Sequence, residues 1–311
     1  MTAMLQRRGP EGAAHWTGES AGFGHTLLVT TPEQQSEQQP FMHRESGCVI
    51  TADARLDNRE ELLDTLNLQA RAESIGDAEL ILHAYMRWGK HCPEHLLGDF
   101  AFAIWDPRQQ MLFCARDHFG LRPFYYHRDP GNRFVFASTP RAILVLPQVP
   151  YRINEGRIAD FLVPELEWID YTSTFFEDVY RLPPGHMAIV SVDGIEVREY
   201  WNPAPGPNPG PLSDREFAKG FLDVLTKAVE SRLRAPPGAV GATMSGGIDS
   251  GSVVAIAKDI LDRRGYGPLR TFSAVDNSDP ACVESRAIHA ASAMATIDPV
   301  LTDLRRVSDL Y

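Results

Sequence analysis

The feature that most constrains this chain is the stretch WNPAPGPNPGPL at residues 201–212, which contains five prolines. Proline has no backbone N–H, so such a stretch cannot form a regular helix or sheet ladder, and it is typical of a semi-extended linker. Directly after it, Ser213 and Glu216 form the S-x-x-E pattern that caps the start of a helix. The predicted organisation is therefore a first domain at 1–205, a linker at 206–213 and the N-terminal part of a second domain at 214–311.

The first domain is predicted to be mainly β structure. Residues 47–56 mix β-branched and apolar residues, as a strand does, whereas apolar residues recur at helical spacing over 58–66 and 77–88. Four aromatic-rich runs follow, and turn residues separate two pairs of them, as β-hairpins require. These runs are 100–106, 111–117, 123–128 and 133–138.

The second domain begins with a helix and continues as strand, loop, helix and strand. The short apolar run 239–244 is predicted to be a buried parallel strand, and a helix is expected from about Ser250 to Arg264, before a second strand at 271–275. In such a βαβ unit, ligands bind beyond the carboxyl ends of the strands. An apolar stripe of Phe217, Phe221, Val224, Leu225 and Ala228 follows the capping pattern and supports the predicted helix start.

The loop between the first strand and its helix has the sequence MSGGIDSGS, residues 244–252. A loop that leads into a helix N-terminus presents unpaired N–H groups, and Gly246 and Gly247 would let an anion approach the backbone. Ser245 and Ser250 could add hydroxyl donors. Asp249 would repel a bare phosphate, so its presence indicates a Mg²⁺ ion between carboxylate and phosphate oxygens.

Other loop types do not fit these residues. A Walker-type loop requires GK[ST], a dinucleotide fingerprint requires G-x-G-x-x-G, and a hydrolase elbow requires G-x-S-x-G, where this chain has Thr243. A plain helix cap by Ser245 or Asp249 is the alternative, although two adjacent glycines would be a costly way to build one. The loop therefore indicates a phosphate site.

Composition excludes several classes of function. The formal net charge of −11 argues against nucleic acid as a partner, because phosphate backbones need clustered positive charge. The sequence has no run of about 18 apolar residues that would indicate a membrane span, and its N-terminus lacks the apolar stretch of a secretory signal. The cytoplasm is therefore the expected compartment. The four scattered cysteines are expected to be free thiols.

SGGIDS resembles the pyrophosphate-binding loop of ATP pyrophosphatases. Together with RRGPEG (7–12), GDFAFAIWD (98–106), ARDHFGLRPFYY (115–126), RLPPGH (181–186) and EYW (199–201), it makes the chain similar to the glutamine-hydrolysing asparagine synthetase family. The resemblance implies an N-terminal four-layer αββα domain of the Ntn-amidohydrolase, class II glutamine amidotransferase type. A partial α/β domain with a parallel sheet, of the ATP-pyrophosphatase type, is expected after it.

The glutaminase residues of the family are not matched. Thr2 stands where an N-terminal cysteine nucleophile would follow Met1, and the RGP segment begins at Arg8, so a chain shortened at both ends is expected. Where the family has the Asn-Gly of its oxyanion hole, followed by Glu, this chain has Asp53, Ala54 and Arg55. The substrate-carboxylate arginine of the family falls near Thr26. Asp77 matches the family's aspartate for the glutamine ammonium group, or it caps the helix at 78–88.

The resemblance implies a carbon–nitrogen ligase that uses ATP and Mg²⁺ to activate an acid, aspartate in the family, with release of pyrophosphate. Lost glutaminase residues also occur in β-lactam synthetases and lasso-peptide cyclases, so intramolecular amide formation is an alternative, and a non-catalytic scaffold is a third. A homodimer is compatible with the resemblance. By resemblance, Ser245, Gly246, Gly247 and Ser250 would hold pyrophosphate, Asp249 would bind Mg²⁺, and backbone at Met244, Ser273 and Ala274 would contact adenine.

Overall fold

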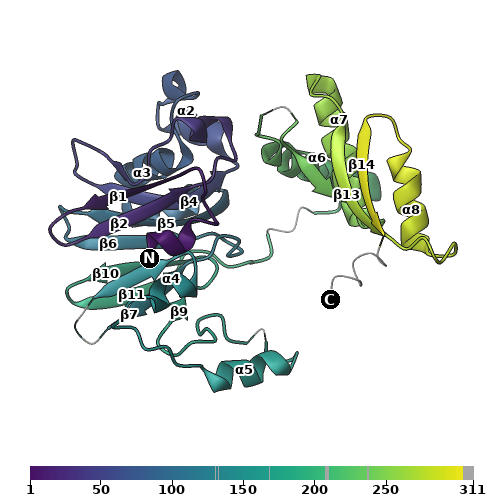
Figure 1. Cartoon of the computed structure of the whole chain (residues 1–311). Helices are drawn as coiled ribbons and strands as arrows, with labels where there is room; N and C mark the ends of the chain where they lie inside the picture. The colour runs from purple at the N-terminus through teal and green to yellow at the C-terminus, as the bar shows by residue number, and fades with distance from the viewer. Residues whose placement is uncertain (130, 132, 168, 207–209, 237, 304–311) are drawn as a thin grey trace. The chain divides into compact units, whose positions relative to one another are not determined.

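The computed structural model describes residues 1–303 except 130, 132, 168, 207–209 and 237. The chain forms two compact units, Met1–Pro205 and Gly206–Tyr311 (Figure 1). Residues 207–209 of the expected linker lie outside the described residues.

The first unit is built around a six-stranded antiparallel sheet with the strand order β11-β10-β6-β5-β4-β3. The first two aromatic-rich runs form the predicted hairpin, β5 and β6. In its turn, the buried carboxylate of Asp106 accepts hydrogen bonds from Arg108, Gln109 and the Tyr85 hydroxyl. The strands are β3 (Phe41–Met42), β4 (Val49–Leu56), β5 (Gly98–Asp106), β6 (Met111–Arg116), β10 (His186–Ser191) and β11 (Gly194–Glu199).

A second layer of the first unit contains two smaller antiparallel sheets, β1-β2 and β8-β7-β9. The other two aromatic-rich runs form the predicted pair β7 and β8. Phe23 and Phe124 from this layer pack with Val49 and Ala103 of the six-stranded sheet in one buried core. The strands are β1 (Gly12–Thr17), β2 (Gly22–Leu27), β7 (Tyr125–Arg128), β8 (Phe134–Ala137) and β9 (Tyr180–Arg181).

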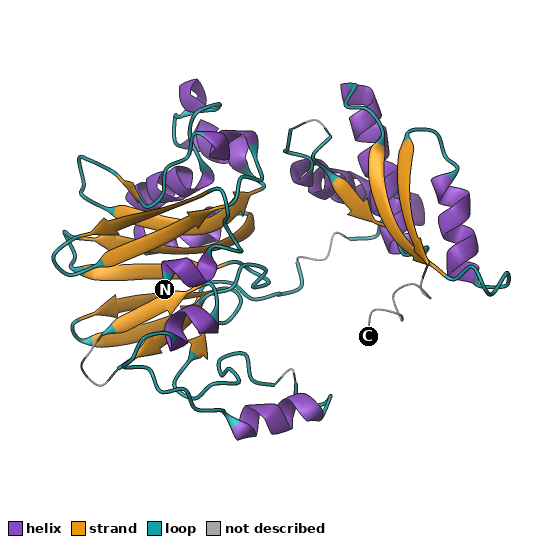
Figure 2. Ribbon diagram, in the orientation of Figure 1, coloured by secondary structure: helices purple, strands orange, loops and turns teal. Residues whose placement is uncertain are grey.

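Helix α3 packs on the six-stranded sheet, and the short helices α1 and α4 pack on β2, β7 and β8 of the second layer (Figure 2). Leu80 and Ile81 of α3 pack with Phe102 of the six-stranded sheet, and Ile143 of α4 packs with Ala137 of β8. The resulting order of helix, sheet, sheet and helix confirms the expected αββα architecture. The helices are α1 (Thr2–Leu5), α2 (Arg59–Thr65), α3 (Asp77–Trp88), α4 (Pro140–Leu144) and α5 (Glu155–Leu162), with 3-10 turns η1 (Pro32–Gln35), η2 (Gln69–Arg71) and η3 (Gly89–His95).

The second unit contains a parallel sheet with the order β12-β13-β14, and β12, α7 and β13 form the predicted βαβ unit. Val254 and Ile260 of α7 pack with Leu269 of β13 in a buried core. The elements are α6 (Asp214–Arg232), β12 (Gly241–Thr243), α7 (Ile248–Arg264), β13 (Leu269–Val275), α8 (Val283–Ser292) and β14 (Ile297–Asp303).

Helix boundaries in this unit follow the predicted signals closely. Ser213 and Glu216 form the expected capping box at the start of α6. α7 begins at Ile248, two residues before the predicted start, because Gly247 has extended backbone angles and acts as the N-cap. The helix ends as predicted before Gly265, whose φ of 68° is left-handed.

The prediction of a buried parallel strand at 239–244 is confirmed in its direction, because β12 pairs with β13 in parallel, and Met244 is buried. Its burial is wrong for Gly241 and Thr243, which are exposed to solvent. Among the described residues β12 pairs only with β13, so one side of the strand has no neighbouring strand.

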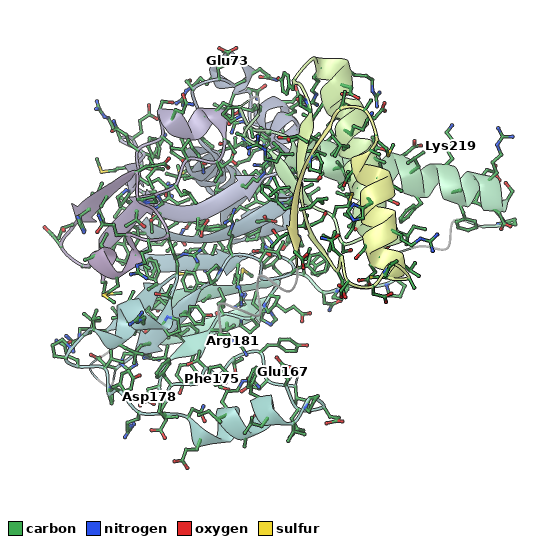
Figure 3. All side chains as sticks on the ribbon, turned by 45° about the vertical axis from the view of Figure 1, so that its right-hand side comes forward. Glu73, Glu167, Phe175, Asp178, Arg181 and Lys219 are labelled. Atoms are coloured by element: carbon green, nitrogen blue, oxygen red, sulfur yellow. The ribbon has the colours of Figure 1, made fainter. Side chains whose placement is uncertain are left out.

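The apolar stripe of α6 is exposed over its first half. Phe217, Phe221 and Val224 are 51%, 70% and 69% exposed, whereas Val229 is buried. The helix meets the core of its unit only through its C-terminal half. The side chain of Lys219, in the first half, projects into solvent (Figure 3).

Candidate phosphate loop and amidotransferase-like cavity

The phosphate-type loop leaves the edge strand β12 and enters α7. Met244 anchors it: its side chain is 2% exposed, and its N–H donates to the Phe272 carbonyl of β13 at 3.0 Å. Ser245, by contrast, is exposed. The loop therefore starts from a fixed point in the core and immediately reaches solvent.

Gly246 and Gly247 have different roles. Gly246 has a φ of 82°, and a Cβ there would lie 2.6 Å from the backbone oxygen of Glu284. Only glycine meets both conditions without movement of the loop. Gly247 has a φ of −77°, and a Cβ there would make an ordinary contact of 3.5 Å with Ser245 Oγ. The close approach at Gly246 packs the loop after β12 against the start of α8.

The two serines brace the loop. Ser245 Oγ and Ser250 Oγ are 3.0 Å apart, and the Ser245 N–H donates to Ser250 Oγ at 3.1 Å. Ser250 Oγ also donates to the Gly247 carbonyl at 3.3 Å. Both hydroxyls thus hold the loop in shape.

The start of α7 leaves backbone donors free. The first N–H groups of a helix have no intrahelical acceptor, and those of Ile248, Asp249 and Ser250 find none among the described residues. Asp249 is exposed in this first turn. The arrangement offers a row of N–H donors with one carboxylate beside it, at the positive end of the helix dipole.

Ser273 and Ala274 occupy neighbouring positions near the carboxyl end of β13. Their side chains alternate across the strand, so Ser273 is buried and Ala274 is exposed. Beyond the strand, Ser285 of α8 accepts a hydrogen bond from the Asp276 N–H at 2.9 Å. Glu284 and Ser285 shape this end of the sheet, and sequence reasoning missed them because no phosphate-loop motif includes them.

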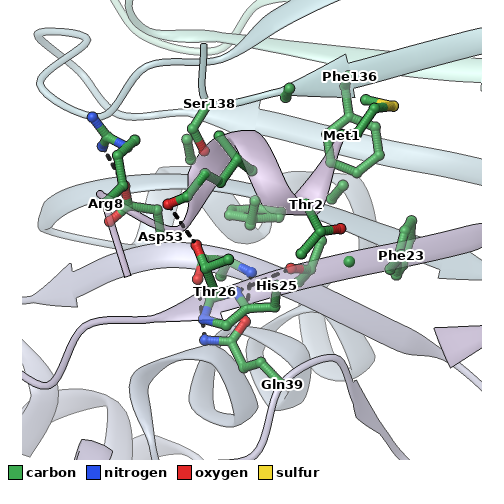
Figure 4. Close-up of a pocket in the computed structure, with 18 of the residues that line it drawn as sticks. Met1, Thr2, Arg8, Phe23, His25, Thr26, Gln39, Asp53, Phe136 and Ser138 are labelled. Atoms are coloured by element: carbon green, nitrogen blue, oxygen red, sulfur yellow. Dashed lines mark hydrogen bonds and ion pairs between the residues drawn. The ribbon is translucent and has the colours of Figure 1, made fainter. Parts of the chain in front are cut away.

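The first unit contains a cavity of about 470 Å³ between its two sheet layers (Figure 4). Three residues of the expected glutamine-site region, Thr26, Asp53 and Ala54, contribute to its wall. Asp53 forms ion pairs with Arg8 at 3.1 Å and Arg122 at 3.3 Å. Two guanidinium groups therefore balance the charge of this carboxylate. A carboxylate in two ion pairs acts as a hydrogen-bond acceptor, whereas an oxyanion needs donors.

Asp77 and Arg55 do not line this cavity. Asp77 is 1% exposed, forms an ion pair with Arg59 at 2.8 Å and accepts the Leu56 N–H at 2.9 Å. It is also not the helix cap, because α3 begins at Asp77 itself with Gly76 as N-cap. Its contacts tie β4 and α2 to the start of α3.

His25 also lines the cavity, and its ring lies 3.3 Å from the Thr51 hydroxyl. Burial lowers the pKa of His25 from 6.5 to about 4, while the charge of Asp53 partly opposes this effect. The ring is therefore neutral at physiological pH and can both accept and donate one hydrogen bond.

Comparison with known protein families shows which family this chain belongs to. A family model described as a glutamine amidotransferase domain matches residues 1–201, and one described as asparagine synthase matches residues 220–302. The chain belongs to the asparagine synthetase family, with a glutamine amidotransferase domain. The four-layer first unit and the parallel sheet of the second unit are the architectures expected for that family.

Two curated relatives are themselves asparagine synthetases by name. Asparagine synthetase [glutamine-hydrolyzing] 3 of Bacillus subtilis is 30% identical over 88% of this chain, and putative asparagine synthetase 2 of Methanocaldococcus jannaschii is 29% identical over 88%. The chain spans 44% and 55% of the lengths of these two relatives. A solved glutamine PRPP amidotransferase from B. subtilis has 16% identity and a TM-score of 0.42, covering 91% of this chain and 76% of its own.

Three further findings concern the described residues as a whole. No helix among the described residues is long and apolar enough to cross a membrane. Within the same residues, no three His, Cys, Asp or Glu side chains gather as a metal-binding group. The cysteines are free thiols, as predicted, and Cys48, Cys92 and Cys114 are buried.

Proposed function

We propose that the second unit binds Mg·ATP and that its loop holds the pyrophosphate end of the nucleotide. The N–H groups at the start of α7, with Gly246 and Gly247, would receive the phosphate oxygens. Backbone at Met244, Ser273 and Ala274 would contact the adenine. The observation that carries the proposal is the left-handed Gly246, which packs against Glu284 and leaves the helix N-terminus open.

The residues present fit a magnesium ion that arrives with the nucleotide. Asp249 is a single exposed carboxylate, and the described residues hold no cluster of three metal ligands. Mg²⁺ commonly keeps water and phosphate oxygens as ligands and needs only one or two carboxylates. Asp249 would hold this ion, which when bound neutralises phosphate charge.

The chemistry that we propose is ATP-dependent amide formation. A substrate carboxylate oxygen attacks the α-phosphorus, the bond to the β-phosphate oxygen breaks, and pyrophosphate leaves. An amine then attacks the acyl carbon, and AMP leaves. The names of the relatives point to aspartate as the acid.

The residues around the cavity of the first unit do not suit glutamine hydrolysis, so we expect the amine to come from another source. Asp53 is clamped by Arg8 and Arg122 at the position expected for an oxyanion-hole group, and a carboxylate there cannot stabilise developing negative charge. This observation supports the second candidate, an intramolecular amide-forming reaction of the β-lactam synthetase or lasso-peptide cyclase kind.

The proposal is tested by calorimetric titration of the full chain with Mg·ATP and with Mg·pyrophosphate. Asp249→Ala is expected to abolish the magnesium-dependent part of binding. Asp259→Ala is the matched control, because it removes the same charge about 15 Å farther along α7. Equal binding by wild type and Asp249→Ala would contradict the assignment, and no binding by wild type would leave the chain as a non-catalytic scaffold.

A further inference from the structure

Helix α5 of the first unit carries its apolar residues on the outside. Arg157 is the buried residue of this helix, whereas Ile158, Phe161 and Leu162 are exposed, Leu162 by 73%. The helix lies at the outer end of the first unit (Figure 1). A surface helix normally turns its apolar side toward the core and its charged residues toward solvent. The first unit therefore does not use the apolar side of α5 for its own packing.

Polar contacts fix the orientation of α5. The Asn154 side chain caps the helix by accepting the Arg157 N–H at 3.1 Å. Arg157 Nη2 donates to the Glu167 carbonyl at 2.9 Å, which ties the following turn back to the helix. Phe161 packs edge-on against Phe175, with 5.4 Å between the ring centres, and Glu167 and Phe175 lie beside α5 in Figure 3. The exposed apolar residues are thus held in a defined arrangement.

The turn after α5 enlarges the exposed apolar area. The Leu166 N–H donates to the Val163 carbonyl at 2.9 Å, and the Ile169 N–H donates to the Leu166 carbonyl at 3.2 Å. All three side chains are exposed. Large apolar side chains that gather on a surface mark an interaction site. The α5 surface consists of Ile158, Phe161, Leu162, Val163, Leu166 and Ile169.

Carboxylates accompany the α5 surface without matching positive charge. Glu155 lies in the first turn of α5, and Glu165 and Glu167 lie in the turn after it. These three form no ion pair with another described residue. The neighbouring arginines do not serve them, because Arg152 pairs with two acidic residues of the following segment and Arg157 is buried. The apolar area therefore has a negative border.

This charge distinguishes between possible occupants. A second copy docked through the same surface would place like carboxylates against one another, and the chain has a formal net charge of −11. An anionic membrane surface would be repelled in the same way. A strand-like peptide needs an unpaired sheet edge, whereas the backbone groups along a helix are bonded within it. A helix with an apolar stripe and basic residues beside that stripe fits both the shape and the charge.

We propose that the α5 surface docks a basic amphipathic helix of a partner protein. Ile158, Phe161 and Leu162 form a ridge at helical spacing, which would pack into the groove between the partner's apolar side chains. Lysine or arginine on the partner would pair with Glu155, Glu165 and Glu167. Apolar contact would supply most of the affinity, and the charges would select the partner and speed the encounter. The proposal is independent of nucleotide binding, since α5 contributes nothing to the phosphate loop.

The first test uses fluorescence anisotropy of a labelled helical peptide with the full chain. The probe is acetyl-Lys-Leu-Lys-Ala-Leu-Leu-Lys-Ala-Leu-Lys-Ala-Leu-Leu-Lys-amide, and the control peptide has glutamate at every lysine position. Docking predicts micromolar binding of the lysine peptide that weakens as salt is added, and binding of the glutamate peptide that is weaker by roughly tenfold or more. No binding of the lysine peptide, or equal binding of the two, would overturn the proposal.

A leucine variant tests the apolar contact. Leu162→Gln should keep the fold, because the side chain is largely exposed, and should weaken binding of the lysine peptide by roughly fivefold to tenfold. Leu97→Gln is the matched control, because it replaces an exposed leucine that follows η3 at the start of the six-stranded sheet's β5. It is expected to leave binding unchanged. Equal affinities of the two variants would contradict the assigned surface.

A pair of charge variants tests the negative border. Glu165→Gln combined with Glu167→Gln should weaken binding by roughly threefold to tenfold. Glu60→Gln combined with Glu61→Gln removes the same charge from exposed positions of α2 and should have little effect. The same loss in both double variants would show a general attraction of the basic peptide to an acidic chain, and would refute a specific site.

Sedimentation distinguishes the other occupants. The full chain is expected not to self-associate through this surface and not to bind vesicles of phosphatidylcholine and phosphatidylserine. Self-association that Leu162→Gln abolishes would assign the surface to a second copy. Vesicle binding that the same variant abolishes would assign it to a membrane, and either result would overturn the proposal.

Discussion

Alanine substitutions at Gly246 and at Gly247 test whether the loop needs glycine at one particular backbone position or simply two small residues. At Gly246, alanine would have to keep a φ of 82°, which costs an L-residue roughly 1–2 kcal/mol. Its Cβ would also lie 2.6 Å from a backbone oxygen of Glu284, a contact that only a shift of the loop or of α8 can relieve. Together these effects predict destabilisation of about 3 kcal/mol.

At Gly247, alanine meets neither obstacle. Its φ of −77° suits any residue, and its Cβ would sit 3.5 Å from Ser245 Oγ. Alanine is a poorer N-cap than glycine, which costs about 0.5–1 kcal/mol, and lower entropy of the unfolded chain offsets part of this. The pair of variants is therefore expected to differ by about 2 kcal/mol.

Scanning calorimetry of the full chain measures the difference. For a unit of this size, 3 kcal/mol corresponds to a fall of roughly 10–20 °C in its transition, while Gly247→Ala should shift it by a few degrees. Titration with Mg·pyrophosphate should show Gly246→Ala losing affinity and Gly247→Ala keeping most of it. Equal shifts for both variants would refute the role of the left-handed position and of the contact with Glu284.

Three further predictions concern the first unit. Asp106→Ala should lower the free energy of unfolding by about 3 kcal/mol, because the Tyr85 hydroxyl and the Arg108 guanidinium lose their buried acceptor. Urea titrations measure this loss, and a value below about 1 kcal/mol would contradict the role of Asp106. Burial lowers the pKa of His25 from 6.5 to about 4 in the folded state, so the free energy of unfolding should fall as the pH drops from 6.5 toward 4, by at most about 3 kcal/mol. His25→Gln should flatten this part of the stability profile. An unchanged profile would be the opposing result. The chain should release no glutamate from glutamine in a coupled assay, and measurable release would overturn the interpretation of Asp53.

Local patterns predicted the regular elements well. The helix at 77–88 matches α3 because its apolar residues repeat at helical spacing, and the start of α6 matches because the capping box is a short-range signal. The strand β14 was not predicted. It contains Pro299, which interrupts a strand pattern but is tolerated because β14 is an edge strand.

Long-range contacts account for what the sequence did not indicate. Nothing near Asp53 predicts its two arginine partners, because Arg8 and Arg122 come from distant parts of the chain. Likewise, Asp77 looks like a ligand or a cap from its neighbours, and only the folded structure shows that Arg59 and the Leu56 N–H occupy its carboxylate. The order of strand, loop and helix around residues 244–252 was easier to predict, because its signals lie within one short segment.

The bracing of the loop bears on the thermodynamics of binding. Met244 is fixed in the core, and the hydroxyls of Ser245 and Ser250 are hydrogen-bonded to each other. A segment that is already ordered loses little conformational entropy when an anion arrives. Most of the free energy gained from each phosphate contact would then remain available as affinity, and the amide of Met244 should resist hydrogen exchange with solvent in both the free and the bound state.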